Sequence, residues 1–187
     1  VHGGAGEWVD GGGGSGGRIA LHLARQQFTG TINTRSGGGS AYGGAGTLYT
    51  RINGVPGGEL VLENNGNKAG LSPLEVPPDT RLVLSGGASV YPPARLELVS
   101  LHLRNGASIT HTNGQPRLHL EIRENLTLDE GTSLTASGLG YPVGKDPGPG
   151  AGATGDVCGG GGGHGGLGGL AWPGNVPGGD AYGSVLE

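Results

Sequence analysis

The chain has 187 residues, including 46 glycines and 12 prolines, and its formal net charge is −4 at pH 7. This glycine and proline content is typical of low-complexity chains, but several segments with alternating leucines argue against disorder. One Phe, two Trp and no Met provide little for a compact globular core, whereas stacked aliphatic strands need only Leu, Ile and Val. The few charges are spread along the chain, which argues against a nucleic-acid binder. The apolar runs are too short for a membrane-spanning helix.

The N-terminal part of the chain alternates between glycine-rich segments and short predicted strands. Residues 1–17 and 36–46 are glycine-rich. Between them, the alternation from Arg18 to Leu23 predicts a strand with one apolar face, and residues 28–34 predict a second short strand. The same strand-then-turn pattern returns at residues 47–52 and 59–66.

Three copies of the pattern L-x-L-x-x-G-x-S follow, beginning at Leu82, Leu101 and Leu126. In each copy, two alternating leucines predict a short strand with one apolar face, the glycine turns the chain, and the next aliphatic residue points inward again. The intervals between the copies suit the coils of a solenoid. The sequence therefore predicts an all-β fold, a parallel β-helix with long glycine-rich inserts.

The alignment of the copies predicts which side chains become neighbours. Equivalent positions on successive coils of a parallel stack lie about 4.8 Å apart, and each buried aliphatic side chain contributes roughly 1.5–3 kcal/mol. The expected core ladder has three columns: Leu82, Leu101 and Leu126; Leu84, Leu103 and Leu128; Val90, Ile109 and Leu134.

The same alignment makes two predictions about polar side chains on successive coils. Arg104 is expected beside Asp129 as an exposed pair of opposite charge, worth at most about 1 kcal/mol. Ser89, Ser108 and Ser133 are expected to form a ladder of hydroxyl groups. Both features would help to set the register of the coils.

The segment 138–183 is again dominated by glycine, and two structures are compatible with it. Glycine loses more entropy on ordering than any other residue, which favours a flexible linker. Alternatively, extended glycine segments can pack closely side by side because no Cβ separates them. We favour the ordered form because apolar and aromatic residues are spaced through the segment as anchors. These are Tyr141, Leu167, Leu170, Trp172 and Tyr182.

Catalytic and metal sites have little support in the sequence. A polysaccharide-degrading β-helix would need carboxylates that converge on one outer face, and the candidates Glu121, Glu124, Asp129 and Glu130 are better explained as a solvated face. The six histidines show no ligand spacing. We expect no enzyme activity, no metal and no cofactor.

Two single residues are candidates for modification. Asn125 begins the sequon Asn-Leu-Thr and is expected to point outward, which makes it a candidate for glycosylation, although such triplets also arise by chance. Cys158 is the one cysteine of the chain, so it is either an unpaired small residue or forms an intermolecular disulfide in an oxidising medium.

Several motifs together resemble the glycine-rich β-helical tandem repeats of very large secreted or cell-surface proteins. The motifs are Gly-Gly-Arg18-Ile19-Ala20-Leu21, Phe28-Thr29-Gly30-Thr31-Ile32, Tyr42-Gly43-Gly44-Ala45-Gly46-Thr47, Asn64-Asn65-Gly66, Leu126-Thr127-Leu128 and Gly163-His164-Gly165-Gly166. The resemblance implies an extracellular scaffold or adhesin-like role without a catalytic set.

On this basis residues 1–187 are expected to form one β-helical repeat unit, with coils at 18–35 and 47–137 and glycine-rich segments at 1–17, 36–46 and 138–183. The echo of residues 40–44 in residues 180–184 suggests one period of a longer array. The expected function is a structural unit of an extracellular fibre that stacks head to tail with copies of itself. The alternative is a carbohydrate-binding or polysaccharide-degrading β-helix protein with surface glycans as partners, for which Trp8, Trp172 and Tyr182 would serve as sugar platforms.

Overall fold

The structure, a computed structural model, describes residues 3–7, 9–68, 70–112, 117–137, 159–172 and 175–183. The chain divides into two compact units. The first unit contains Val1–His111 and Arg117–Ala136, and the second contains Thr112–Pro116 and Ser137–Glu187. The described residues form β-strands and no helix, so the predicted all-β class is confirmed.

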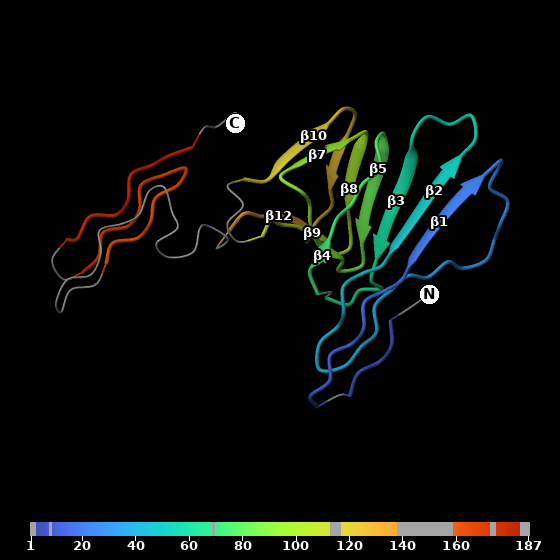
Figure 1. Cartoon of the computed structure of the whole chain (residues 1–187), viewed down its shortest axis with the longest axis horizontal. Coiled ribbons are helices and arrows are strands. Elements are labelled where there is room, and N and C mark those ends of the chain that lie inside the picture. The colour runs from blue at the N-terminus through green and yellow to red at the C-terminus, as the bar shows by residue number, and fades with distance from the viewer. Residues whose placement is uncertain are drawn as a thin grey trace. The chain divides into compact units, whose positions relative to one another are not determined.

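All named strands lie in the first unit (Figure 1). They are β1 (Arg18–Leu23), β2 (Thr47–Ile52), β3 (Gly58–Glu63), β4 (Ser72–Pro73), β5 (Thr80–Ser85), β6 (Ser89–Tyr91), β7 (Arg95–Leu98), β8 (Ser100–Leu103), β9 (Ser108–Ile109), β10 (His119–Ile122), β11 (Leu126–Leu128) and β12 (Ser133–Leu134).

The strands form three sheets, with the orders β1-β2-β3-β5-β8-β11, β12-β9-β6-β4 and β10-β7. From β5 onward the chain visits the three sheets in turn, with β5, β6 and β7 followed by β8, β9 and β10. Each of these strands pairs in parallel with its equivalent from the previous or next passage. Strand β3 also pairs in parallel with β5, whereas β2 pairs antiparallel with β3.

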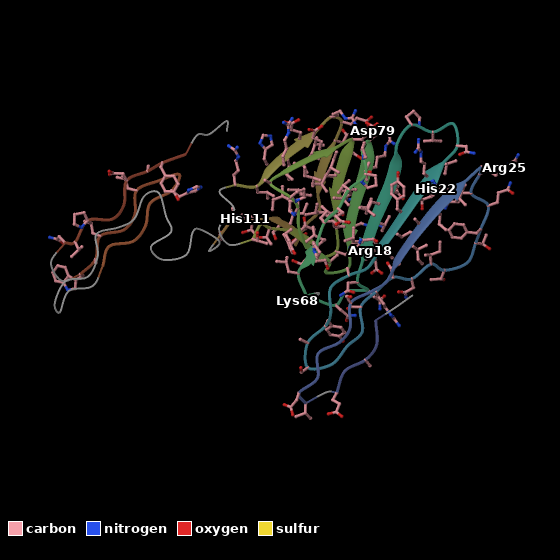
Figure 2. All side chains as sticks on the ribbon, viewed as in Figure 1. Arg18, His22, Arg25, Lys68, Asp79 and His111 are labelled. Carbon is pink, nitrogen blue, oxygen red and sulfur yellow. The ribbon has the colours of Figure 1, made fainter. Side chains whose placement is uncertain are left out.

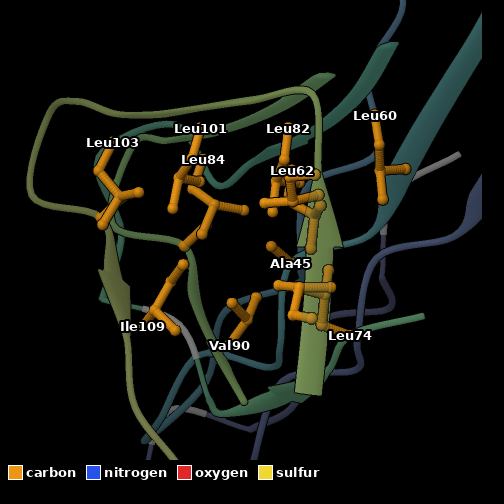
Figure 3. Packing of buried hydrophobic residues seen from close by; sticks show 14 residues of the cluster. Ala45, Leu60, Leu62, Leu74, Leu82, Leu84, Val90, Leu101, Leu103 and Ile109 are labelled. Atoms are coloured by element: carbon orange, nitrogen blue, oxygen red, sulfur yellow. The ribbon is translucent and has the colours of Figure 1, made fainter. Parts of the chain in front are cut away.

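The core of the first unit lies between these sheets and is built from aliphatic side chains (Figure 3). Leucines alternate along β3, β5 and β8, and the residues between them face outward, so each strand contributes one apolar face. The buried apolar residues of the second sheet are Val90 and Ile109, which lie across the interior from these leucines.

The turn after each leucine pair depends on glycine. Gly87, Gly106 and Gly131 occupy the equivalent position of the three copies, and their φ angles are 78°, 75° and 78°. Backbone in this left-handed region is strained for residues with a Cβ. The shared glycine of the sequence pattern is therefore explained by the conformation of the turn.

The antiparallel pairing of β2 with β3 changes which face of the sheet is apolar. Residues that lie directly opposite in a sheet share a face. Tyr49 is opposite Leu60 and packs against the leucine core, whereas Leu48 is opposite Val61 on the outer face. The aliphatic residues of β2, Leu48 and Ile52, therefore face away from the core.

Strand β1 pairs in parallel with β2, so its aliphatic residues also face away from the core. Its residues Ile19, Leu21 and Leu23 pair with Leu48, Thr50 and Ile52 on the outer face. The alternation predicted for β1 is present, but it does not extend the leucine core. The structure also differs from the prediction at residues 28–34, which form no strand.

The glycine-rich residues 3–7, 9–17 and 33–46 form what we call the N-terminal glycine bundle. Backbone hydrogen bonds join its segments across the sequence, such as Gly3 N to Arg35 O at 3.0 Å and Gly16 N to Gly44 O at 2.9 Å. A Cβ at Gly16 would collide with the carbonyl oxygen of Thr34. Glycine is required here because backbones approach too closely for any side chain, as at the axis of collagen.

Residues 159–172 and 175–183 of the second unit form the C-terminal glycine bundle. Its three segments bond in a cycle: Gly161 N donates to Gly169 O, Gly168 N to Gly179 O, and Gly179 N back to Gly161 O, at 2.8 to 2.9 Å. The rings of His164 and Tyr182 pack in a T-shaped arrangement with their centroids 4.8 Å apart. The described glycine tract is thus ordered as packed extended segments.

Candidate functional site

The expected ladder residues lie in the register that the sequence alignment implies. Leu82 is opposite Leu101 and Leu101 is opposite Leu126. Ile109 pairs with Val90 on one side and with Leu134 on the other. Strand β3 adds a further level to the ladder, because Leu60 and Leu62 pair with Leu82 and Leu84. The interior residues Leu82, Leu84, Val90, Leu101, Leu103 and Ile109 are all at most 1% exposed.

The last level of the ladder is open. Leu126 and Leu128 are in register with buried leucines of β8, yet they are 49% and 45% exposed. Leu134 on β12 is partly exposed. The prediction that all nine residues are buried is therefore wrong for this level, because no later strand covers it among the described residues. The result is an uncovered apolar surface at the β11–β12 end of the unit.

The opposite end of the ladder is covered by other parts of the first unit. On the core face beyond β3 lie Tyr49, packed on the leucines, and Ala45, which is buried in the core cluster. The N-terminal glycine bundle is fastened to this end by Ser72 Oγ, which donates to Ala45 O at 3.4 Å, and by Ser36 N, which donates to buried Asn64 Oδ1 at 2.8 Å. The two ends of the ladder therefore differ in chemical character.

Polar side chains join neighbouring levels on the outside. Ser89 Oγ and Ser108 Oγ are 2.8 Å apart, the first step of the predicted hydroxyl ladder. Asp129 pairs with His102 Nε2 at 3.1 Å rather than with Arg104. Asp129 lies diagonally from His102 because His102 is directly opposite Thr127.

A charged hydrogen bond on the outer surface joins β7 and β10. Arg95 donates to Glu121 with an N–O distance of 2.7 Å, and it also lies 3.2 Å from Glu97. The hydrogen bond from Arg95 holds the pKa of the Glu121 carboxyl below its usual range, and the same bond raises the pKa of Arg95. Both side chains are exposed, so this pair sets register more than stability.

Three of the four carboxylates weighed as catalytic candidates have separate structural partners. Glu121 pairs with Arg95, Glu124 lies 3.8 Å from Arg81, and Asp129 pairs with His102. Arg123 reaches back to Asp79. Within the described residues, no three His, Cys, Asp or Glu side chains are grouped closely enough to hold a metal ion.

Of the two candidate modification sites, Asn125 and Cys158, the structure describes only Asn125. Asn125 is exposed, directly before β11, and its backbone oxygen accepts a bond from Leu101 N at 2.9 Å. Cys158 lies outside the described residues, as do Trp8 and Tyr141. In the portion of the chain that is described, no helix is long and apolar enough to cross a membrane.

Two apolar surfaces were not predicted from the sequence. One is the outer face of β1 and β2, with Ile19, Leu21 and Leu23, whose side chains are partly exposed. The other lies on the C-terminal glycine bundle, where Leu167, Leu170 and Trp172 are 78%, 70% and 80% exposed. The hairpin signal Asn53-Gly54 could have revealed the first surface, because it implies antiparallel pairing of the strands on either side.

Comparison of the chain with models of protein families, with curated proteins and with solved structures finds no match.

Proposed function

We propose that the chain is a structural unit of an extracellular fibre or surface scaffold, built on a parallel β-helix and joined to copies of itself. The single observation that carries this proposal is the uncovered last level of the leucine ladder. Two leucines at 49% and 45% exposure continue columns that are otherwise fully buried. Burial of this end by another strand would stabilise an assembly at about 25 cal/mol per Å² of apolar surface removed from water.

The β-helix interpretation is supported by the order of the sheets. The chain returns to the six-stranded sheet at β5, β8 and β11, and each return pairs in parallel with the one before. Equivalent side chains are thereby stacked in columns, which is the arrangement that gives solenoids their stiffness. A stiff unit with one open end suits a scaffold.

The glycine bundles support the same function in a different way. Both bundles are held by backbone hydrogen bonds between segments distant in sequence, including Gly13 N to Ala41 O and Gly168 N to Gly179 O, each at 2.8 Å. Bonded segments of this kind act as spacers of fixed dimensions rather than as flexible linkers. The extracellular location follows from the resemblance to secreted repeat proteins.

The test is the concentration dependence of assembly in the full chain and in the double variant Leu126→Lys with Leu128→Lys. The parent chain is expected to form oligomers or filaments in sedimentation and electron microscopy, and the double variant is expected to remain monomeric. Leu167→Lys with Leu170→Lys is the matched control, since it introduces the same two charges at exposed leucines of the C-terminal glycine bundle. A parent chain that stays monomeric at all concentrations would contradict the proposal.

A glycan-binding function is the second candidate, and the exposed ring of Trp172 favours it. A flat aromatic face in solvent is a suitable platform for a sugar ring. Tyr182 is less suitable because His164 packs against its ring. Quenching of tryptophan fluorescence by oligosaccharides in the parent chain, with Trp172→Ala as the comparison, would test this candidate. The absence of a Trp172-dependent signal would eliminate it.

A further inference from the structure

The two edges of the six-stranded sheet are β1 and β11. Among the described residues, each edge strand has one side that pairs with no strand and therefore presents backbone groups that can take another strand. The inference below rests on the proposed function, the assembly of copies of the chain, and specifies how two copies join at these edges. Three properties of the edges decide the geometry: the backbone groups they present, the faces that carry their apolar side chains, and their charges.

On β11, the backbone groups of Leu126 and Leu128 point to the free edge. The oxygen of Asn125 accepts from Leu101 N, and the N–H of Asp129 donates to Leu103 O, so these groups face β8. Because alternate residues of a strand direct their groups to opposite sides, those of Leu126 and Leu128 point away from β8.

On β1, the free groups belong to Arg18, Ala20 and His22. The oxygen of Gly17 accepts from Thr47 N, and the oxygen of Leu23 accepts from Asn53 N, so the odd-numbered residues face β2. The groups of the even-numbered residues therefore point to the open side of the sheet.

The pairing mode then determines which side chains meet. In a parallel pair, a residue whose groups point to the neighbour lies opposite one whose groups point away, as Leu101 lies opposite Leu126. In an antiparallel pair, residues directly opposite both point inward or both point outward. Parallel addition of β1 therefore places Leu126 and Leu128 beside Ile19, Leu21 or Leu23. Antiparallel addition would place the same leucines beside Arg18, Ala20 or His22.

We propose that β1 of one copy adds in parallel to the free edge of β11 of the next copy. The parallel mode brings the exposed aliphatic residues of the two edge strands together on one face of the sheet, whereas the antiparallel mode sets at least one of the two leucines against Arg18 or His22. Cross-strand aliphatic neighbours are favourable, and buried unpaired charges are not.

The charges at the two edges agree with this arrangement. Acidic residues flank β11, namely Glu124, Asp129 and Glu130, while Arg18 and Arg25 stand at the two ends of β1 (Figure 2). Pairing of Leu126 with Ile19 places Asp129 opposite His22. Only one other register pairs both leucines with aliphatic residues, namely Leu126 opposite Leu21. It would place Arg123 opposite Arg18, so the first register is preferred.

The geometry has a consequence for the symmetry of the assembly. Within one chain, Ile19 and Leu21 lie on the face opposite to the leucine core. If they share a face with Leu126 of a neighbouring copy, the cores of successive copies lie on alternate faces of one continuous sheet. Neighbouring copies are then related by a half-turn about the direction of growth.

Cysteine trapping tests the pairing, in full chains that carry Cys158→Ser. Chains with Ala20→Cys are mixed with chains with Thr127→Cys under mild oxidation. In the preferred register these two positions are directly opposite, so a disulfide-linked dimer is expected in the mixture and in neither sample alone. Leu21→Cys, mixed with Thr127→Cys, is the matched control, because it reports the antiparallel mode. Electron microscopy of the assembled parent chain is expected to show the half-turn between copies.

Trapping through Leu21→Cys instead of Ala20→Cys would overturn the inference, and so would filaments without a half-turn between copies. Either result leaves the scaffold function in place, because assembly would still occur. A chain that never assembles would overturn both.

Discussion

Tyr49 lies opposite Leu60 across the antiparallel junction of β2 and β3, and its ring packs against the leucine core. This pairing ends the parallel stack on one side. It also turns Leu48 and the apolar residues of β1 to the outer face, and it leaves a polar row, including Arg51 and His22, on the core face beyond Tyr49. This one strand pairing thus closes one end of the ladder. It also places aliphatic residues on the outer face of β1, where they can meet the exposed leucines of β11 in another copy.

Truncation of Leu103 is expected to be among the most damaging single changes. Leu103 is fully buried, so Leu103→Ala should lower the free energy of unfolding by about 2–5 kcal/mol. Leu128→Ala removes the same atoms from the same column, but at an exposed position it should cost at most about 1 kcal/mol in the monomer. Urea unfolding followed by far-ultraviolet circular dichroism measures both. Equal losses would show that the ladder is also closed at β11.

Adjacent glycines of the C-terminal glycine bundle are expected to respond differently to the same change. A Cβ at Gly168 would collide with the oxygen of Gly161, whereas a Cβ at Gly169 would meet nothing within 4 Å. Gly168→Ala should therefore abolish protection of the Gly179 amide against hydrogen exchange, since that amide bonds to Gly161 O. Gly169→Ala should leave the protection in place. Rapid exchange in the parent chain would mean that the bundle does not form in solution.

The turn at Gly106 should tolerate asparagine better than alanine. Its φ angle is 75° and a Cβ at this position would meet no atom within 4 Å, so the cost of a side chain comes from the backbone alone. Gly106→Ala is expected to cost about 1 kcal/mol. Gly106→Asn should cost less, because Asn adopts this region more readily, as Asn105 does here with a φ angle of 51°. Thermal unfolding compares the two, and a smaller loss for alanine would contradict the strain argument.

Acid should weaken the contact between β7 and β10. The pKa of Glu121 is lowered in the folded chain by its hydrogen bond to Arg95. A lowered carboxyl pKa contributes stability above the unfolded value of about 4.3, and this contribution is lost as the pH falls through the folded pKa. Glu121→Gln is expected to flatten the dependence of the unfolding midpoint on pH between about 5 and 3. The difference should shrink in high salt because the pair is exposed, and an unchanged pH profile would argue against the pair.

The leucine columns could be predicted because two local signals agree. The alternation of Leu82 and Leu84 gives the face of the strand, and the glycine with a positive φ angle gives the turn, so aligned copies must stack in register. Burial of Leu126 and Leu128 could not be predicted in the same way, because it depends on whether a further strand follows. The sequence pattern of a last level is the same as that of an inner level.

Other features were missed for identifiable reasons. Asn53-Gly54 indicates an antiparallel hairpin between β2 and β3, but the regular spacing of the strands along the chain favours parallel coils instead. In the glycine bundles, the glycines at which a Cβ would collide with a neighbouring backbone can be three residues apart, as Gly13 and Gly16 or Gly160 and Gly163 are. This interval is the sequence signal for close packing. That interval is hidden among neighbouring glycines, such as Gly12 and Gly169, which have free space around them.

The C-terminal glycine bundle has a thermal consequence. It is held by backbone hydrogen bonds between chains of glycine and buries few apolar side chains, as the exposure of Leu167 and Leu170 shows. Unfolding that exposes peptide groups rather than hydrocarbon gives a small change in heat capacity. Its stability should therefore continue to increase on cooling, without the maximum near room temperature that a leucine core imposes, so the two units should melt with differently curved temperature profiles.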